Sequence, residues 1–253
     1  MWASMAALIA VFLISPTLFI VPMSFSADPS LHFPPARWSG RWYMNFFASD
    51  MWLSGAVTSL KVGLLAAGIA TLLGTTIAFG TIRGRIPGRL AVSTLILSPL
   101  IVPIIVVAIG MYFVFSRWGL VGTFQGLVVA HAALGVPFVV INVSAVLRTV
   151  DMNLELAAQS LGASAAQTFA RITLPLIVPG VAAGALFAFI TSWDEVVVAI
   201  FISSPQVRTL PIVMWSQVRG EVDPTIAAVS TMLTLFSMAT LIGFMLVRRR
   251  LAA

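Results

Sequence analysis

Long apolar runs separated by short polar stretches dominate the pattern of the 253-residue chain. Six runs reach the ~20 residues that a helix needs to cross the ~30 Å hydrocarbon core of a bilayer. They lie near residues 3–21, 56–81, 90–115, 124–147, 176–202 and 225–247. Because lipid offers no partner to backbone polar groups, each run is predicted to be a helix. The pattern predicts an all-α integral membrane protein with six transmembrane helices.

Composition supports this class. The chain is 60% hydrophobic and 9% charged, with a mean hydropathy of +1.06, whereas about a quarter of a soluble domain is charged. The net charge of +6 does not indicate nucleic-acid binding, because the arginines lie at segment ends and form no patch. The absence of cysteine excludes disulfides, thiolate catalysis and Cys-ligated metal.

The basic residues predict the orientation. Three polar stretches, after the second, fourth and sixth runs, hold Arg83, Arg85, Arg89, Arg148, Arg171, Arg248, Arg249 and Arg250. The positive-inside rule places these stretches in the cytoplasm, and six spans then place both termini there. The first run is either a retained helix or a cleaved signal peptide. Its length and the lack of a preceding Lys or Arg favour a retained helix.

Two outer stretches carry aromatic residues. In the first, aromatic residues recur at roughly helical spacing: Trp38, Trp42, Tyr43, Phe46, Phe47 and Trp52. This spacing predicts an interfacial helix whose rings anchor it to the membrane. The last outer stretch, residues 203–224, contains Leu210-Pro211 and Trp215. It is expected either to return toward the membrane or to face an external partner.

The stretch between the fourth and fifth runs is amphipathic. Asp151 and Asn153 are suitable helix caps, and Gly162 is suited to the positive φ that ends a helix. Ser164 and Gln167 form a capping-box pattern for a second short helix, and Pro175 is expected to start the fifth span. One helix face combines Leu154, Ala157, Ala158 and Leu161. A helix–turn–helix lying across the cytoplasmic face of the membrane is predicted.

The spacing of this stretch resembles a family motif. Ala157-Ala158, then Gly162 after three residues, then Ile172-Thr173-Leu174-Pro175 after nine, is similar to the E-A-A-x3-G-x9-I-x-L-P loop of ABC-importer permeases. In that family the loop forms a coupling helix that docks into a groove on a cytoplasmic ATPase. The resemblance implies a coupling surface made of Glu155, Leu156, Ala157, Ala158, Leu161, Gly162 and Ala163.

One position departs from the motif. Its glutamate aligns with Leu156, and the nearest acid, Glu155, is one residue earlier. A helical step of ~100° separates the two side chains, so Glu155 is not a simple replacement. We expect docking through apolar and small side chains, with Glu155 as a more exposed and less important contact.

The resemblance continues from about Ser54 to the C-terminus. The stretches "TSLKVGLLAAGIATLLGTTIAFG", "HAALGVPFVVINVSAVLR" and "SWDEVVVAIFISSP" look most like permeases of the spermidine/putrescine type. This resemblance implies the type I permease fold, with a coupling helix between spans four and five, in a bacterial inner membrane. It implies import of a small cationic solute (polyamine-like, or a related amine or opine) by alternating access.

The same resemblance implies partners and a division of labour. The expected partners are two ATPase copies, a second permease (homologous or identical) and a periplasmic solute-binding protein. The chain has no G-x-x-x-x-G-K-[ST] loop, so it is expected to be no enzyme. ATP and Mg²⁺ are expected on the ATPase, and no cofactor or metal on this chain. The expected division is a first transmembrane helix (1–25), a periplasmic loop (26–53) and a five-helix core (54–253) with a coupling loop at 148–175.

Charges inside the predicted spans offer a substrate pathway. Asp194 and Glu195 lie in the fifth span and Lys61 lies at similar depth in the second. Intramembrane charges usually face a bundle interior or an aqueous cavity. Either one acid lines the pathway and attracts a cation, or an acid pairs with Lys61 to hold the bundle. Trp193 is either a stacking surface for an amine or, as we favour, a packed core residue.

His131 beside Pro137 is expected to be a packed or hydrogen-bonded residue rather than a ligand. An ion-coupled secondary transporter using Asp194, Glu195 and Lys61 is the alternative function. It would have no use for a docking loop, and the chain shows no convincing internal repeat of the kind such transporters often carry. A membrane enzyme would need a converging catalytic set, which His131 and two acids on one other helix barely supply.

Overall fold

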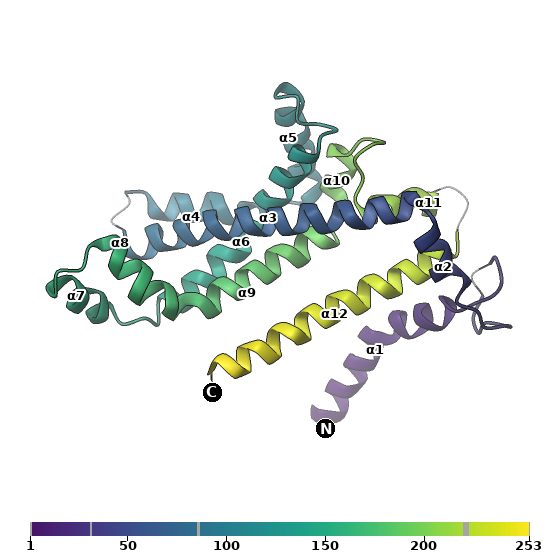
Figure 1. The fold of residues 1–253 in the computed structure, drawn as a ribbon, viewed down its shortest axis with the longest axis horizontal. Coiled ribbons are helices and arrows are strands. Elements are labelled where there is room, and N and C mark those ends of the chain that lie inside the picture. Colours follow the sequence, from purple (N-terminus) through teal and green to yellow (C-terminus); the bar gives the residue numbers. More distant parts are fainter. Residues whose placement is uncertain (1, 31, 85–86, 220–222, 253) are drawn as a thin grey trace. The chain divides into compact units, whose positions relative to one another are not determined.

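The computed structural model describes residues 2–30, 32–84, 87–219 and 223–252, and these fold almost entirely into helices (Figure 1). Five helices are long and apolar over enough of their length to cross a membrane: α1 (Trp2–Met23), α3 (Asp50–Arg83), α6 (Phe124–Leu147), α9 (Leu174–Trp193, extended back to Ala165) and α12 (Thr225–Ala252). A bent pair, α4 (Arg89–Leu97) with η1 (Ser98–Leu100) and α5 (Ile104–Arg117), supplies a sixth candidate span. The predicted all-α fold is confirmed.

The third span is not one straight helix. Its two halves meet at 106° across the break after Leu100. Pro99 lies in the 3₁₀ turn, and Pro103 precedes α5 with an extended backbone (φ −52°, ψ 129°). Proline has no N–H to donate and disfavours a helical residue before it. The prediction of a continuous helix over 90–115 was therefore wrong at its centre.

The fifth span is also interrupted. Helix α9 ends at Trp193, and the short helix α10 (Val197–Ile202) begins after three intervening residues. The prediction of one helix over 176–202 missed this break. Asp194 and Glu195 lie in the break itself, so their side chains are not arranged as neighbours on a regular helix.

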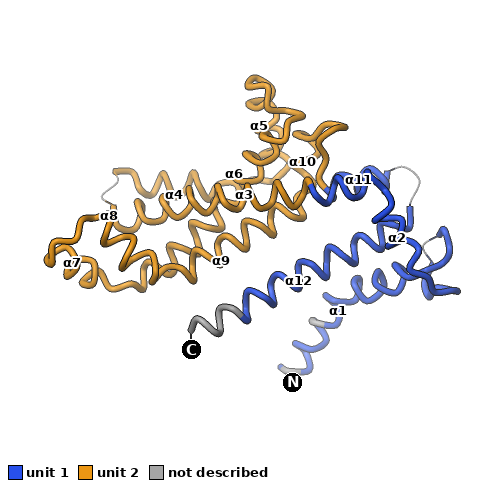
Figure 2. The backbone as a smooth tube through the Cα atoms, in the orientation of Figure 1, with its two compact units in different colours: residues 1–57, 210–253 blue, residues 58–209 orange. Residues whose placement is uncertain are grey.

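Contacts divide the chain into two compact units (Figure 2): residues 1–57 with 210–253, and residues 58–209. The first unit contains α1, α2 (Arg41–Ala48), the start of α3, α11 (Leu210–Arg219) and α12. A buried cluster joins the last four of these elements, formed by Phe46, Trp52, Leu210, Val213 and Val229. The expected boundaries at residues 25 and 53 stay a prediction, since the units describe contacts within the chain and not its path across a membrane.

The aromatic stretch is partly a core element. The predicted interfacial helix exists as α2, but Trp42, Phe46 and Trp52 are buried. Trp38 and Phe47 are exposed, as anchors should be. The spacing of aromatic residues along the sequence does not indicate which of them pack against α12 and which face the lipid. The expectation that these rings all serve as anchors was wrong for the three buried ones.

The second unit is organised around the pair α6 and α9, which make its most extensive helix–helix contact. Glycines allow the close approach. A Cβ on Gly184 would lie 2.8 Å from Cα of Val139, and one on Gly180 would lie 2.9 Å from the carbonyl oxygen of Asn142. Small residues at helix interfaces permit such packing in membranes. Gly180 and Gly184 therefore lie where α9 packs closely on α6.

Candidate functional site

The predicted coupling loop folds as two short helices. Helix α7 (Met152–Ser160) begins after Asp151, whose carboxylate accepts a hydrogen bond from the N–H of Asn153 at 2.9 Å. Gly162 follows the end of α7 with φ +86°, a left-handed conformation that costs glycine little. Asp151 and Gly162 therefore act as predicted, whereas Asn153 lies inside the helix and caps nothing.

The second helix starts as its sequence predicts. Ser164 and Gln167 form a complete capping box at the start of α8 (Ala165–Thr168), each side chain bonded to the other's backbone. A π-helical turn, η2 (Phe169–Thr173), then leads into α9, with Pro175 in its first turn. Proline is tolerated there because the wider π-helical turn, in which the N–H of Leu174 bonds to the carbonyl of Phe169, already departs from the regular α-helical hydrogen-bond pattern.

Three leucines on α7 and its following turn are exposed, among exposed polar residues such as Gln159 and Ser160. Leu154 and Leu156 are exposed, and the side chain of Leu161 is 89% exposed. Ala157 is exposed, while Ala158 and Ala163 are half-buried. Exposed apolar side chains grouped on one short element, with small residues between them, are typical of a protein-docking surface.

Glu155 faces the opposite way from these leucines. It is the buried residue of α7, at 8% exposure. Its Oε1 lies 3.1 Å from Nε of Arg83, the last residue of α3, and Nη2 of Arg83 donates to the carbonyl of Val150 at 2.8 Å. The expectation that Glu155 is a more exposed contact was wrong, because one helical step of ~100° turns it inward as it turns Leu156 outward.

Arg83 is the residue that sequence reasoning missed. The sequence indicates only that Arg83 is one of the basic residues at the cytoplasmic end of a span. In the structure it binds Glu155 of α7 and the carbonyl of Val150, just before α7 begins. A buried charge that loses its partner is strongly unfavourable. The ion pair and the hydrogen bond to Val150 therefore fix α7 to the end of the long helix α3.

The interruption between α9 and α10 separates the roles of the two acids. Glu195 is buried, and its Oε1 accepts a hydrogen bond from the N–H of Val198 at 2.7 Å. This contact caps the start of α10. Asp194 is exposed. Of the two, Asp194 offers a carboxylate to the surroundings, and Glu195 holds the local backbone.

Lys61 is not brought to these acids. Its side chain is exposed on α3. Within the described parts of the chain, two ion pairs form, Arg37 with Asp28 and Arg83 with Glu155. The alternative in which Lys61 pairs with Asp194 or Glu195 is therefore not observed.

Two further candidate residues lie in the packed interior of the second unit. Trp193 is buried and stacks on Phe189, with ring centroids 5.7 Å apart and planes at 22°. His131 is buried, and its Nδ1 lies 2.8 Å from Oγ of Ser192. These positions agree with packing for Trp193 and with a hydrogen-bonded, buried side chain for His131. Among the described residues, no group of three His, Asp or Glu side chains is placed to hold a metal.

Sequence comparisons give relatives of one kind. Putrescine transport system permease protein PotI of Escherichia coli K12 is 34% identical over 229 residues, covering 88% of this chain and 81% of the relative. Spermidine/putrescine transport system permease protein PotC of the same organism is 34% identical over 216 residues, covering 84% and 82%. PotC of Haemophilus influenzae is 31% identical over 240 residues, covering 94% and 93%.

Solved structures share the fold at lower identity. A bacterial ABC transporter that imports the acidic polysaccharide alginate superposes with a TM-score of 0.73 at 14% identity, covering 98% of this chain and 94% of its own. An amino acid ABC transporter superposes with a TM-score of 0.62 at 22% identity, covering 83% and 98%. Residues 70–252 match the family described as "Binding-protein-dependent transport system inner membrane component". The chain thus belongs to this family and is a multi-pass inner-membrane permease of the ABC-importer type.

Proposed function

We propose that this permease couples import to a separate ATPase through α7 and the turn that ends at Gly162. The observation that carries the proposal is the exposure of Leu154, Leu156 and Leu161, on an element that the Arg83–Glu155 ion pair fixes to α3. A docking surface that was free to swing would transmit little movement. The ion pair makes the outward face part of a rigid connection.

The proposed mechanism is alternating access. Closure of two ATPase copies would press on α7, and the Arg83–Glu155 ion pair would pass the displacement to α3. The close packing of α6 on α9 at Gly184 favours movement of that pair as one body. The bundle would then reopen toward the periplasm, where a solute-binding protein delivers its ligand.

We propose a small organic cation of the polyamine class as the solute. Two lines support it: the names of relatives about a third identical over most of the chain, and the exposed carboxylate of Asp194 at the interruption of a span. A cation crossing a low-dielectric bundle needs negative charge nearby. Trp193, Glu195 and His131 are buried in this chain, so their proposed part is to shape the wall around Asp194.

The proposed assembly has one further permease, homologous or identical, two ATPases that hold ATP and Mg²⁺, and a periplasmic binding protein. A structural neighbour, an alginate ABC transporter, was solved in complex with its own periplasmic protein, which supports the last of these. Both termini are proposed to be cytoplasmic, on the side of Arg83 and Arg148, by the positive-inside rule.

Co-purification followed by transport tests this function. The chain, isolated from its native membrane in mild detergent, should bring an ATPase with it. Reconstituted with its binding protein, it should take up labelled putrescine or spermidine only with ATP inside the vesicles, and a neutral sugar should not compete. Uptake driven by an ion gradient without ATP would instead support the secondary transporter. The separation of Lys61 from Asp194 and Glu195 does not favour that alternative.

A further inference from the structure

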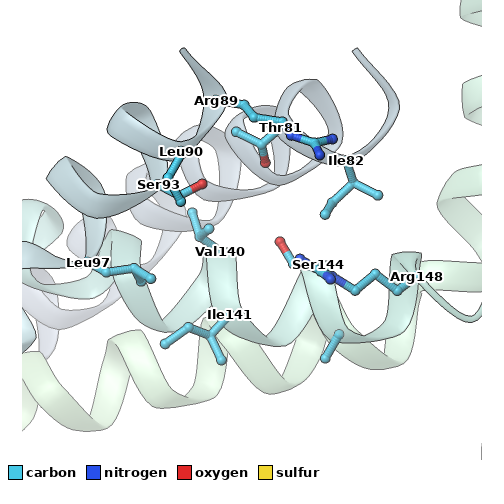
Figure 3. A pocket seen from close by; sticks show the side chains of 11 residues that line it. Thr81, Ile82, Arg89, Leu90, Ser93, Leu97, Val140, Ile141, Ser144 and Arg148 are labelled. Atoms are coloured by element: carbon cyan, nitrogen blue, oxygen red, sulfur yellow. The ribbon is translucent and has the colours of Figure 1, made fainter. Parts of the chain in front are cut away.

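A hollow of about 750 Å³ lies in the second unit, where α3 ends, α4 begins and α6 ends (Figure 3). Eleven residues line it. They include two arginines, Arg89 and Arg148, and no acid. Neither arginine forms an ion pair with a described acid, whereas the neighbouring Arg83 is neutralised by Glu155. The hollow therefore carries positive charge that nothing within the described chain balances.

Hydroxyl groups share the hollow with the arginines. Ser93 of α4 and Ser144 of α6 line it, and Figure 3 shows their oxygens directed into the space between the helices. Arg89 also stands in the first turn of α4, where the helix dipole favours a negative group. Guanidinium groups and hydroxyls together suit the oxygens of a phosphate, which accept several hydrogen bonds at once.

The position of the hollow corresponds to a membrane–water interface. Thr81 lies two residues before the end of α3, Arg89 begins α4, and Arg148 directly follows α6. All three helices are mostly apolar between these polar ends and their opposite ends, with Lys61 of α3 and His131 of α6 as exceptions. The lining of the hollow is polar in one part and apolar in another, since Leu90 and Ile141 add exposed apolar surface beside the arginines.

We propose that this hollow binds the phosphate headgroup of an anionic phospholipid, with Arg89 and Arg148 as its charge partners. Basic pockets between transmembrane helices at this depth recognise such headgroups. A free phosphate would satisfy the arginines but would leave the apolar wall of Leu90 and Ile141 against water. An acyl chain covers that wall, so a lipid fits both halves of the site.

The inference needs only that the chain lies in a membrane, and it is independent of the solute. Its consequence is structural: α4, a short helix beside a 106° bend, would be held to α6 by a lipid that bridges Arg89 and Arg148. Loss of the lipid would loosen the contact between these two helices at the end that also carries the coupling loop.

Native mass spectrometry of the assembled transporter tests the proposal. Complexes released from nanodiscs of equal phosphatidylglycerol and phosphatidylcholine should retain phosphatidylglycerol preferentially. Each of Arg89→Gln and Arg148→Gln should weaken that retention about fivefold, and the double variant should abolish the preference. Arg171→Gln is the matched control, because it removes one exposed arginine of the same polar side that does not line the hollow, and it should retain the lipid as the unaltered protein does.

Five results would overturn the proposal. Equal retention of phosphatidylglycerol and phosphatidylcholine would show that the hollow does not recognise an anionic headgroup. Unchanged phosphatidylglycerol retention in the double variant, or an equal loss in Arg171→Gln, would show that general surface charge holds the lipid. Displacement of the lipid by 10-fold excess inorganic phosphate would identify a soluble phosphate site. Retention by the isolated chain that disappears on assembly would show that the second permease fills the hollow instead.

Discussion

The Nε atom of Arg83 lies 3.1 Å from Oε1 of Glu155, so an ion pair joins the end of α3 to α7. Both side chains are about one-tenth exposed. Removing one partner of a buried pair leaves an uncompensated charge, which costs about 3–5 kcal/mol. Glu155→Ala should therefore lower the thermal stability of the purified chain and reduce coupled transport. Glu155→Gln should do less harm, since its amide oxygen still accepts from Arg83.

The control for this prediction is Asp50→Asn. Asp50 is exposed in the first turn of α3 and forms no ion pair with a described residue, so its loss should change stability little. If Glu155→Ala behaved like Asp50→Asn in both unfolding and transport, the ion pair would not hold α7 to α3.

The contact between α6 and α9 leads to a second prediction, about stability alone. A Cβ on Gly184 would lie 2.8 Å from Cα of Val139, a backbone atom that cannot turn aside. Overpacking of this kind costs about 1–3 kcal/mol, so Gly184→Ala should lower the thermal midpoint of unfolding. Gly68→Ala, in α3 with open space around the added carbon, should leave the midpoint unchanged or raise it. Equal midpoints for the two variants would contradict the close approach of α6 and α9.

Features set by neighbouring residues were predictable from sequence. The capping box of Ser164 with Gln167 and the left-handed turn at Gly162 each depend on chemistry within four positions, and the structure has both. The existence of six apolar spans was equally predictable, because hydropathy over ~20 residues needs no knowledge of packing.

Features set by packing were not predictable. The ion pair of Arg83 with Glu155 joins residues 72 positions apart. No pattern in the sequence near Arg83 indicates that its side chain binds an acid of another helix. The interruption at Asp194 follows from a side-chain cap on Val198 and not from proline or glycine, the usual sequence signals of a break. The two prolines of the third span were visible in the sequence, but its 106° bend was not expected from hydropathy alone.

The turn after α7 gives a third prediction. Gly162 has φ +86°, and nothing lies within 4 Å of the Cβ that a substitution would add. The cost of Gly162→Val is therefore conformational and not steric, about 1–2 kcal/mol or more for a β-branched residue. We expect normal amounts of the variant in the membrane, with ATP hydrolysis that no longer drives uptake.

Gly162→Asn provides the matched comparison, because asparagine tolerates a left-handed backbone. It should transport substantially better than Gly162→Val. If both variants lost transport equally, the absence of a side chain at Gly162 would matter, and not the backbone conformation of the turn.

The exposed leucines give a fourth prediction. Leu156 and Leu161 are exposed in the chain, so their truncation should not destabilise the isolated protein. If they dock on an ATPase, each of Leu156→Ala and Leu161→Ala should weaken its co-purification, by about 1.5–3 kcal/mol where the leucine becomes fully buried. Leu72→Ala, at a leucine of α3 that is also exposed, should not. If Leu156→Ala and Leu161→Ala both left ATPase co-purification unchanged, the hypothesis of an apolar docking surface would be wrong.

The final prediction separates the two acids at the interruption of the fifth span. Asp194 is exposed, whereas Glu195 accepts a hydrogen bond from Val198 and caps α10. Asp194→Asn should therefore reduce uptake of a polyamine while assembly with the ATPase stays intact, since it removes charge without breaking a contact. Glu195→Gln keeps an oxygen that accepts from Val198 and should be mild, but Glu195→Ala should impair folding because a buried N–H loses its acceptor.

Lys61 completes this test through a double-mutant cycle. Lys61→Met combined with Asp194→Asn should show no coupling in assembly, because Lys61 is exposed and forms no ion pair with a described acid. Rescue of Asp194→Asn assembly by Lys61→Met would show instead that the two charges meet in the assembled transporter. Full transport by Asp194→Asn would end the case for Asp194 in the substrate pathway. The coupling role of α7 would stand in that event, since it depends on Leu156, Gly162 and the Arg83–Glu155 ion pair and on no residue of the pathway.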